Sequence, residues 1–191
     1  MSEGHRFKVD LSAYGAGGFD RGASRVVEGL WRLTQAGLFQ ACPFGLYALK
    51  RAVLRAFGAR IGRGVVLKPG VKITFPWKLE LGDHVWVGEE AWLHNLDPII
   101  IGSHACVSQR AMLCAGSHDY RAPTFDLRTA PIRVGEGAWV AAMAWVGPGV
   151  TIGSHAVLAA GSVAGRDLEP YGVYRGNPAG LVGERAPETP V

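Results

Sequence analysis

The sequence predicts a mainly β fold, a parallel β-helix of three-sided coils with an N-terminal helical extension and an extruded loop. Three observations predict it. From Ile61 onward an aliphatic residue recurs every six positions, glycine often follows it directly, and a small or β-branched residue follows four positions after it. A period of six fits neither an α-helix nor an alternating strand, but three short strands and tight turns would close a coil of about eighteen residues, with the glycines allowing the sharp corners. An irregular β-sandwich gives no reason for such a period.

The spacing of the coils changes along the chain. The first three coils start twenty residues apart, at Ile61, Leu81 and Ile101, which predicts a two-residue bulge in each of them. The last two coils start eighteen residues apart, which predicts none. The phase is lost between these groups, so an extruded loop is expected over about 118–132. The aliphatic positions are Ile61, Leu67, Ile73, Leu81, Val87, Leu93, Ile101, Val107, Leu113, Val134, Val140, Val146, Ile152 and Leu158.

The repeat divides the chain into three parts. Residues 1–57 precede it and are expected to form an extended arm followed by two helices, with Ser24 capping the first helix and Pro43 separating the two. Residues 58–163 form the β-helix with its loop. Residues 164–191 form a closing segment and a tail.

Charge is distributed unevenly. The net charge is +4 and the pI is about 9.1, yet no Asp or Glu occurs from Leu30 to Leu79. The second predicted helix carries Lys50, Arg51 and Arg55 on one face. Two interpretations are open: the helix docks on an anionic membrane surface, or it packs on the open end of the β-helix and covers its edge. Nothing in the sequence beyond this modest positive charge supports nucleic-acid binding, so we expect no nucleic-acid partner.

Cysteine usage and hydropathy indicate the compartment. The three cysteines, Cys42, Cys106 and Cys114, are odd in number and form no C-x-x-C motif, so neither a disulfide framework nor a zinc ribbon is predicted. The N-terminal residues lack the apolar core of a signal peptide, and charged residues interrupt the apolar stretch near 30–57. We expect a cytoplasmic protein, with the inner face of the membrane as one place where it could act.

The repeat and four further segments resemble a known family. The hexapeptides resemble those of the left-handed β-helix acyltransferases, and within that superfamily the chain is similar to the colanic-acid biosynthesis O-acetyltransferases over nearly its full length. Its Pro-Trp-Lys segment and long N-terminal extension set it apart from the shorter maltose and galactoside acetyltransferases. The segments are Phe57-Gly58-Ala59-Arg60-Ile61-Gly62, Val71-Lys72-Ile73-Thr74-Phe75-Pro76-Trp77-Lys78-Leu79, Gly116-Ser117-His118-Asp119 and Arg175-Gly176-Asn177-Pro178-Ala179.

The resemblance implies a fold, an activity and an assembly. Parallel crossovers are normally right-handed, so the left hand of the coil is implied by the resemblance alone. The activity implied is transfer of an acetyl group from acetyl-CoA to a sugar hydroxyl, in an exopolysaccharide repeat unit or a precursor such as a lipid-linked glycan. The assembly implied is a homotrimer, with each site between two subunits.

His118 is the candidate general base. It lies where the repeat ends and the predicted loop begins, where a regular scaffold can present a side chain to a ligand. A hydroxyl is a poor nucleophile until a base takes its proton, and histidine titrates in the right range. In the resembled family this position carries the catalytic histidine; the alternative is an exposed turn residue.

Four nearby polar residues are candidates for substrate binding. Asp119 could orient the imidazole or cap the loop. His94, Asn95 and Glu89 lie one coil before His118 and could contact the acceptor, or could be ordinary surface residues.

The cofactor candidates come from the resemblance. It implies that the side chain of Trp139 flanks coenzyme A, that the backbones of Ala142 and Ala160 line the pantetheine arm, and that Arg166 and Arg175 contact phosphate. This sequence departs from some relatives by having Gly180 where they carry an arginine.

Alternatives to the sugar acetyltransferase stay open. The chain could use a different acceptor, such as serine or an antibiotic. His84 and His104 should stack in adjacent coils, which also raises a metal-binding β-helix, although this corner position takes many polar residues. We expect no metal.

Overall fold

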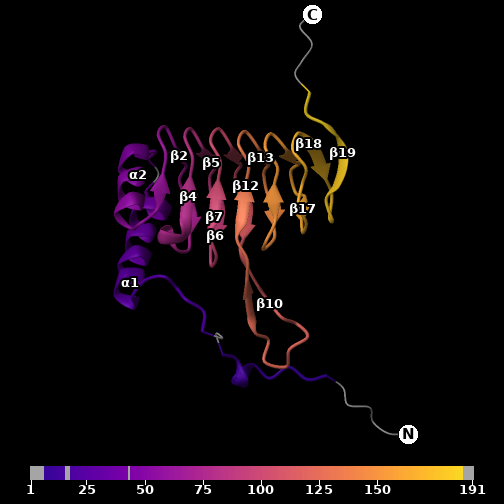
Figure 1. Cartoon of the computed structure of the whole chain (residues 1–191). Coiled ribbons are helices and arrows are strands. Elements are labelled where there is room, and N and C mark those ends of the chain that lie inside the picture. Colours follow the sequence, from indigo (N-terminus) through magenta and orange to yellow (C-terminus); the bar gives the residue numbers. More distant parts are fainter. Residues whose placement is uncertain (1–6, 16–17, 43, 187–191) are drawn as a thin grey trace, which may run out of the picture.

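The chain forms a parallel solenoid that is capped by helices at one end (Figure 1). The computed structural model describes residues 7–15, 18–42 and 44–186, so Pro43 and the end of the predicted tail lie outside the described residues. The first helix begins at the predicted cap, where Ser24 Oγ accepts from Val27 N. The helical elements are the 3₁₀ turn η1 (Leu11–Ala13), α1 (Arg25–Thr34), the π-helical continuation η2 (Gln35–Ala41), α2 (Tyr47–Ala56) and the 3₁₀ turn η3 (Pro76–Lys78).

Three sheets form the sides of the solenoid, and the chain visits them in the order A, B, C, so the corners are A/B, B/C and C/A. Sheet A contains β1 (Arg60–Ile61), β4 (Leu79–Leu81), β7 (Ile99–Ile101), β12 (Ile132–Val134) and β15 (Thr151–Ile152). Sheet B contains β2 (Val66–Leu67), β5 (Trp86–Val87), β8 (Cys106–Val107), β13 (Trp139–Val140), β16 (Val157–Leu158), β18 (Gly172–Arg175) and the antiparallel β19 (Gly180–Glu184). Sheet C contains β3 (Lys72–Ile73), β6 (Trp92–His94), β9 (Met112–Cys114), β14 (Trp145–Val146) and β17 (Val163–Ala164).

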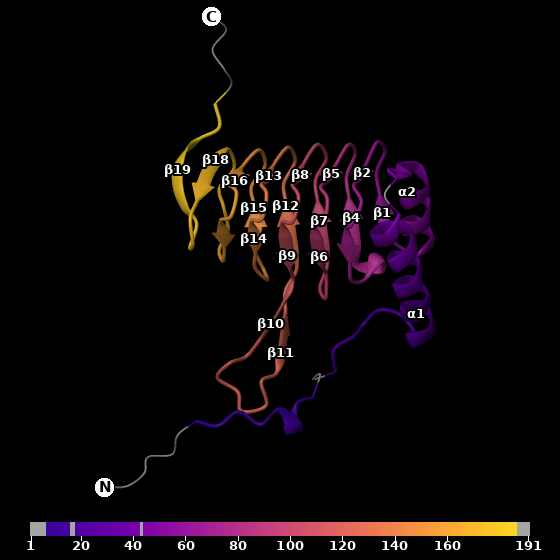
Figure 2. The same cartoon turned by 180° about the vertical axis from the view of Figure 1, so that it is seen from behind.

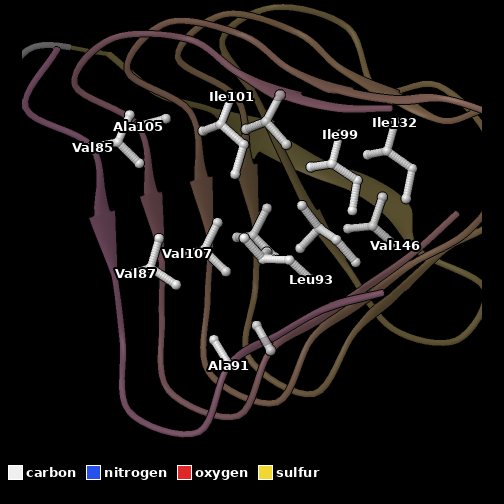
Figure 3. Close-up of a cluster of buried hydrophobic side chains, with 14 of the residues drawn as sticks. Val85, Val87, Ala91, Leu93, Ile99, Ile101, Ala105, Val107, Ile132 and Val146 are labelled. Carbon is white, nitrogen blue, oxygen red and sulfur yellow. The ribbon is translucent and has the colours of Figure 1, made fainter. Parts of the chain in front are cut away.

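Aliphatic side chains from all three sheets fill the centre of the solenoid (Figure 3). Of the fourteen predicted aliphatic positions, each is buried, and Leu67, Ile73, Leu93 and Leu113 have no exposed surface. The small residues at the corners, such as Ala91 and Ala105, are buried as well. Each fully buried aliphatic side chain contributes about 1.5–3 kcal/mol of transfer free energy. The fold class predicted from the six-residue period is confirmed.

The glycines that follow the aliphatic residues are needed for a different reason from the one expected. We predicted that they permit a sharp corner, yet at the A/B corner the left-handed backbone falls two residues later, for example at Gly64 (φ 64°) and His84 (φ 58°). A Cβ on Gly82 would lie 2.5 Å from Ser103 N, and one on Gly135 would lie 2.5 Å from Ser154 N. Close stacking of successive coils therefore excludes a side chain there.

The predicted two-residue bulges are present in the first two coils and lie at the C/A corner, whereas the third coil carries a longer excursion there. The register Arg60↔Glu80 and Glu80↔Ile100 keeps the twenty-residue spacing. The first bulge forms η3, and the second contains Asn95. The Asn95 side chain is fully buried: Oδ1 accepts from Thr74 N (3.0 Å) and Phe75 N (2.9 Å), and Nδ2 donates to Phe75 O (2.5 Å). This amide joins the two bulges.

Basic side chains of α2 bind the edge of the first coil. Lys50 Nζ donates to Leu67 O (3.1 Å), and Arg51 Nη1 donates to Val65 O (2.8 Å). Arg55 donates to the carbonyls of Ile61 (2.7 and 3.0 Å) and Gly62 (2.9 Å). These carbonyls face away from the second coil and lack a strand partner on that side, so a cationic helix satisfies them.

This arrangement supports one of the two interpretations of the cationic helix. Its apolar residue Leu54 is buried against the coil, and Lys50, Arg51 and Arg55 donate to the same edge, so α2 covers the open end of the β-helix. Within the described residues, no helix is long and apolar enough to cross a membrane.

Substitution of the buried Lys50 tests how much these contacts contribute to stability. Lys50→Ala should lower the free energy of unfolding by about 2–4 kcal/mol, because it leaves both a cavity and an unpaired carbonyl. Lys50→Met retains most of the volume and should cost about 1–2 kcal/mol. Urea unfolding measures both values; a Lys50→Ala protein as stable as the wild type would contradict this role.

Candidate active site

An antiparallel hairpin interrupts the solenoid and carries His118. It consists of β10 (Gly116–His118) and β11 (Leu127–Thr129), paired Gly116↔Thr129 and His118↔Leu127. It leaves the coil at the C/A corner, between β9 and β12, and projects away from the prism (Figures 1 and 2). A Cβ on Gly116, at its root, would lie 2.7 Å from Leu96 Cδ1 in the preceding bulge, so a larger residue there would require the Leu96 side chain to move. The excursion thus begins two residues before the predicted loop.

The imidazole of His118 is held in one orientation by Phe125. His118 Nδ1 lies 2.8 Å from Phe125 O, and a carbonyl oxygen can only accept, so Nδ1 carries a hydrogen and, in the neutral ring, Nε2 holds the free lone pair. The Phe125 ring stacks on the imidazole with centroids 4.3 Å apart and planes 8° apart. Phe125 has a left-handed backbone (φ 52°), which turns both its carbonyl and its ring toward His118. The His118 side chain is half-buried, and its imidazole can accept a proton at Nε2.

Asp119 caps the hairpin loop. Its carboxylate accepts from Arg121 N (3.0 Å) and forms an ion pair with Arg128. The Arg128 guanidinium, together with the Arg121 N–H, holds the pKa of Asp119 below its usual range. Its hydrogen bonds therefore run to Arg121 and Arg128, and the polar partner of His118 is Phe125. Of the two roles left open for Asp119, the contacts favour the loop cap.

The three acceptor candidates lie in three different environments. His94 lies at the end of β6 near the C/A corner, where its Nδ1 is 3.1 Å from Thr74 Oγ1 and burial lowers its pKa. Asn95 is wrong as an acceptor contact, because its side chain has no exposed surface and its amide bonds to Thr74 and Phe75. Glu89 is exposed at the B/C corner. It lines a shallow hollow together with Glu90, Gln109, Arg110, Ala142 and Met143.

Most of the cofactor candidates gather at the B/C corner. Trp139 opens β13, is 43% exposed, and donates from Nε1 to Ser108 Oγ (2.8 Å). Ala142 and Ala160 lie in neighbouring turns, which Gly161 N joins by donating to Ala142 O (2.9 Å). Arg175 ends β18 in the same sheet as Trp139 and is exposed.

Arg166 and His118 lie instead at the C/A corner. Arg166 is exposed between β17 and the bridge of Leu168 to sheet A, above the point where the hairpin leaves. A single chain therefore presents its candidate base at one corner of the triangle and Trp139, Ala142 and Ala160 at another.

The corner histidines stack as predicted. The rings of His84 and His104 lie 5.2 Å apart with planes 20° apart. In the part of the chain that the structure describes, no group of three or more His, Cys, Asp or Glu side chains could hold a metal ion.

Phe125 was missed by the sequence analysis, as was Tyr14, whose ring centroid lies 5.9 Å from that of His118. Phe125 lies within the predicted loop and Tyr14 within the predicted arm. Neither segment has a period, so no signal in the sequence linked these aromatic residues to His118.

Two solved acetyltransferases have a similar fold. No protein-family model matches the sequence. A hexapeptide-repeat acetyltransferase from Vibrio cholerae, solved with acetyl coenzyme A, superposes with a TM-score of 0.76 at 22% identity over 92% of this chain and 97% of that one. A galactoside acetyltransferase in complex with coenzyme A gives 0.76 at 18% identity, over 84% and 82%. The solenoid is the left-handed β-helix of hexapeptide repeats.

Similarity in sequence points to one group of these acetyltransferases. The chain is 44% identical over 176 residues to the putative colanic acid biosynthesis acetyltransferase WcaF of Escherichia coli K12, covering 92% of this chain and 97% of the relative. It is 21% identical to the Escherichia coli galactoside O-acetyltransferase, over 71% of this chain and 68% of the relative. The chain belongs to the family of the colanic acid biosynthesis acetyltransferases, and is an acyltransferase.

The contacts of Asp119 lead to a prediction about activity. Asp119→Asn weakens an exposed ion pair and should lower kcat by no more than about tenfold. Removal of a carboxylate that orients a catalytic histidine lowers kcat by about 10⁴. Arg128→Ala removes the other partner of the same ion pair and should lower kcat by a similar factor to Asp119→Asn. Steady-state acetyl-transfer rates measure both; a loss near 10⁴ for Asp119→Asn alone would show that the carboxylate acts on the imidazole.

Proposed function

We propose that the chain transfers the acetyl group of acetyl-CoA to a sugar hydroxyl in an exopolysaccharide repeat unit or its precursor, with His118 as general base. The observation that carries the proposal is the hydrogen bond between His118 Nδ1 and Phe125 O, which leaves Nε2 free to take a proton. The named function of WcaF supports the polysaccharide. The solved complexes of similar fold with acetyl-CoA and CoA support the donor. A cytoplasmic location is part of the proposal, supported by the three free cysteines.

The chemistry follows from this orientation. Nε2 accepts the proton of the sugar hydroxyl as its oxygen attacks the thioester carbonyl, and a C–O bond forms. The tetrahedral intermediate collapses, the C–S bond breaks, and the thiolate of CoA takes the proton back from the imidazolium. While the ring is cationic, the Phe125 carbonyl accepts from Nδ1–H and stabilises the positive charge.

Substrate contacts are proposed from the positions of the remaining candidates. Trp139, Ala142 and Ala160 lie side by side along the B/C corner, where they could flank an extended pantetheine arm. Arg166 and Arg175 are exposed guanidinium groups without an ion-pair partner among the described residues, and are suited to the phosphates of CoA. His94 and Glu89 are the remaining acceptor contacts.

The separation of the two corners supports a homotrimer. His118 and the B/C-corner residues of one chain lie on different edges of the prism, so a site that uses both needs a second copy. In a three-fold assembly, the hairpin of each subunit would meet the B/C corner of its neighbour. Each site would then take its base and Arg166 from one chain, and the cofactor contacts at the B/C corner from another.

Shared sites can be tested by mixing two inactive variants. His118→Ala removes the base, and Ala142→Trp fills the proposed cofactor groove. Co-assembled in equal amounts, they should regain about a quarter of wild-type activity, because one site in four takes both intact parts from different chains. Sedimentation should give three times the chain mass. A mixture with no activity, or a monomeric protein, would contradict the shared site.

The role of His118 is tested by His118→Ala. The loss of the base should lower kcat for CoA release by about 10²–10⁴, with acetyl-CoA binding unchanged, because Nε2 acts on the acceptor proton. Thiol release is followed with a panel of free sugars, lipid-linked glycans, serine and aminoglycosides. Turnover of serine or an aminoglycoside in place of a saccharide would indicate the alternative acceptor class, and a near-normal rate for the variant would end the assignment of His118.

A further inference from the structure

The N-terminal arm is attached to the Pro-Trp-Lys bulge. Trp77 Nε1 donates to Arg21 O (2.6 Å), and Lys78 Nζ donates to Asp20 O (2.6 Å). The Lys78 ammonium also lies 4.7 Å from the centre of the Phe19 ring. The bulge lies within a sequence segment that resembles the family. In this structure it holds residues 19–21 of the arm.

A second attachment joins the arm to the tip of the hairpin. Asp10 N donates to Pro123 O (2.8 Å), which ties the arm to the loop that follows His118. The Asp10 carboxylate caps η1 by accepting from Ser12 N (3.0 Å). Both views show the arm running from α1 to the hairpin and crossing its tip (Figures 1 and 2). The arm is therefore fixed on both sides of Tyr14.

Tyr14 lies beside the candidate base as a result. It ends η1, where its N–H donates to Leu11 O (3.2 Å). Its ring centroid is 5.9 Å from that of His118, and the planes are tilted by 57°. Phe125 occupies a stacked position against the same imidazole. Whereas Phe125 is largely covered, Tyr14 keeps 41% of its surface exposed. It therefore offers an aromatic surface and a hydroxyl next to the proton-accepting side chain.

We propose that Tyr14 is an acceptor-binding residue, and that the arm forms one wall of the acceptor site beside His118. The inference rests on the proposed function. A pyranose has an apolar C–H face and a rim of hydroxyls, and a tyrosine presents an apolar ring with a polar tip. A saccharide stacked on Tyr14 would lie beside the His118 ring, whose Nε2 is the proposed proton acceptor. The residues proposed to hold acetyl-CoA, Trp139 and Ala142, belong to the coils and not to the arm, so a change at Tyr14 should affect the acceptor and not acetyl-CoA.

The test compares the effect of each variant on the KM for the saccharide with its effect on the KM for acetyl-CoA. Tyr14→Ala and Tyr14→Phe are compared with Leu11→Ala, a matched control on the same turn with a 64% exposed side chain. The assay uses the saccharide that the wild-type enzyme turns over. The saccharide is varied at saturating acetyl-CoA, and acetyl-CoA is then varied at saturating saccharide. Tyr14→Ala should raise the KM for the saccharide about tenfold and leave the KM for acetyl-CoA unchanged. Tyr14→Phe should stay within about threefold if the ring face makes the main contact, and Leu11→Ala should match the wild type.

The outcomes separate this inference from the general-base proposal. A Tyr14→Ala enzyme with an unchanged saccharide KM, in a protein that His118→Ala inactivates, would overturn the role of Tyr14 alone. Equal increases in both Michaelis constants would also overturn it, because they would indicate general loosening of the hairpin. Full activity of His118→Ala would instead remove the proposed function, whatever the behaviour of Tyr14.

Discussion

The pairing of backbone groups between coils is the constraint on which the rest of the structure depends. Inside the stack, each strand bonds to the coil before it and the coil after it, but the first coil has no predecessor. The carbonyls of Ile61, Val65 and Leu67 are completed by Arg55, Arg51 and Lys50, and Ile73 O accepts from Trp31 Nε1 (2.9 Å). A carboxylate could not replace these donors, because it cannot donate to a carbonyl. A charge pattern typical of an anionic partner is thus used within the fold.

The candidate site exists because the regular pattern is interrupted once. The hairpin leaves at the C/A corner, and its antiparallel strands carry His118 beyond the prism, where Phe125 and Tyr14 surround the ring. The coils provide a rigid base for this excursion, and the arm bridges from the bulge at Trp77 to the loop at Pro123. Segments with no repeat of their own therefore define the surroundings of the imidazole.

Periodic features could be predicted from the sequence, and contacts between aperiodic segments could not. The six-residue period gave the coils, the buried aliphatic positions, the bulges and the stacking of His84 on His104. It also marked the interruption beside His118. The period could not place Tyr14 next to His118, because that contact joins two irregular segments more than a hundred residues apart. Asn95 was misinterpreted because a polar residue at a bulge reads as surface, whereas the bulge there closes over its amide. The glycines were placed correctly but for the wrong physical reason.

The tight stacking at the A/B corner has a consequence for how this fold can change. There a side chain on Gly62, Gly82, Gly102 or Gly135 would collide with the next coil. Both bulges and the hairpin occur at the C/A corner instead. The coils of this chain therefore vary in length at one edge of the prism, and grafted loops intended to alter selectivity belong on that edge.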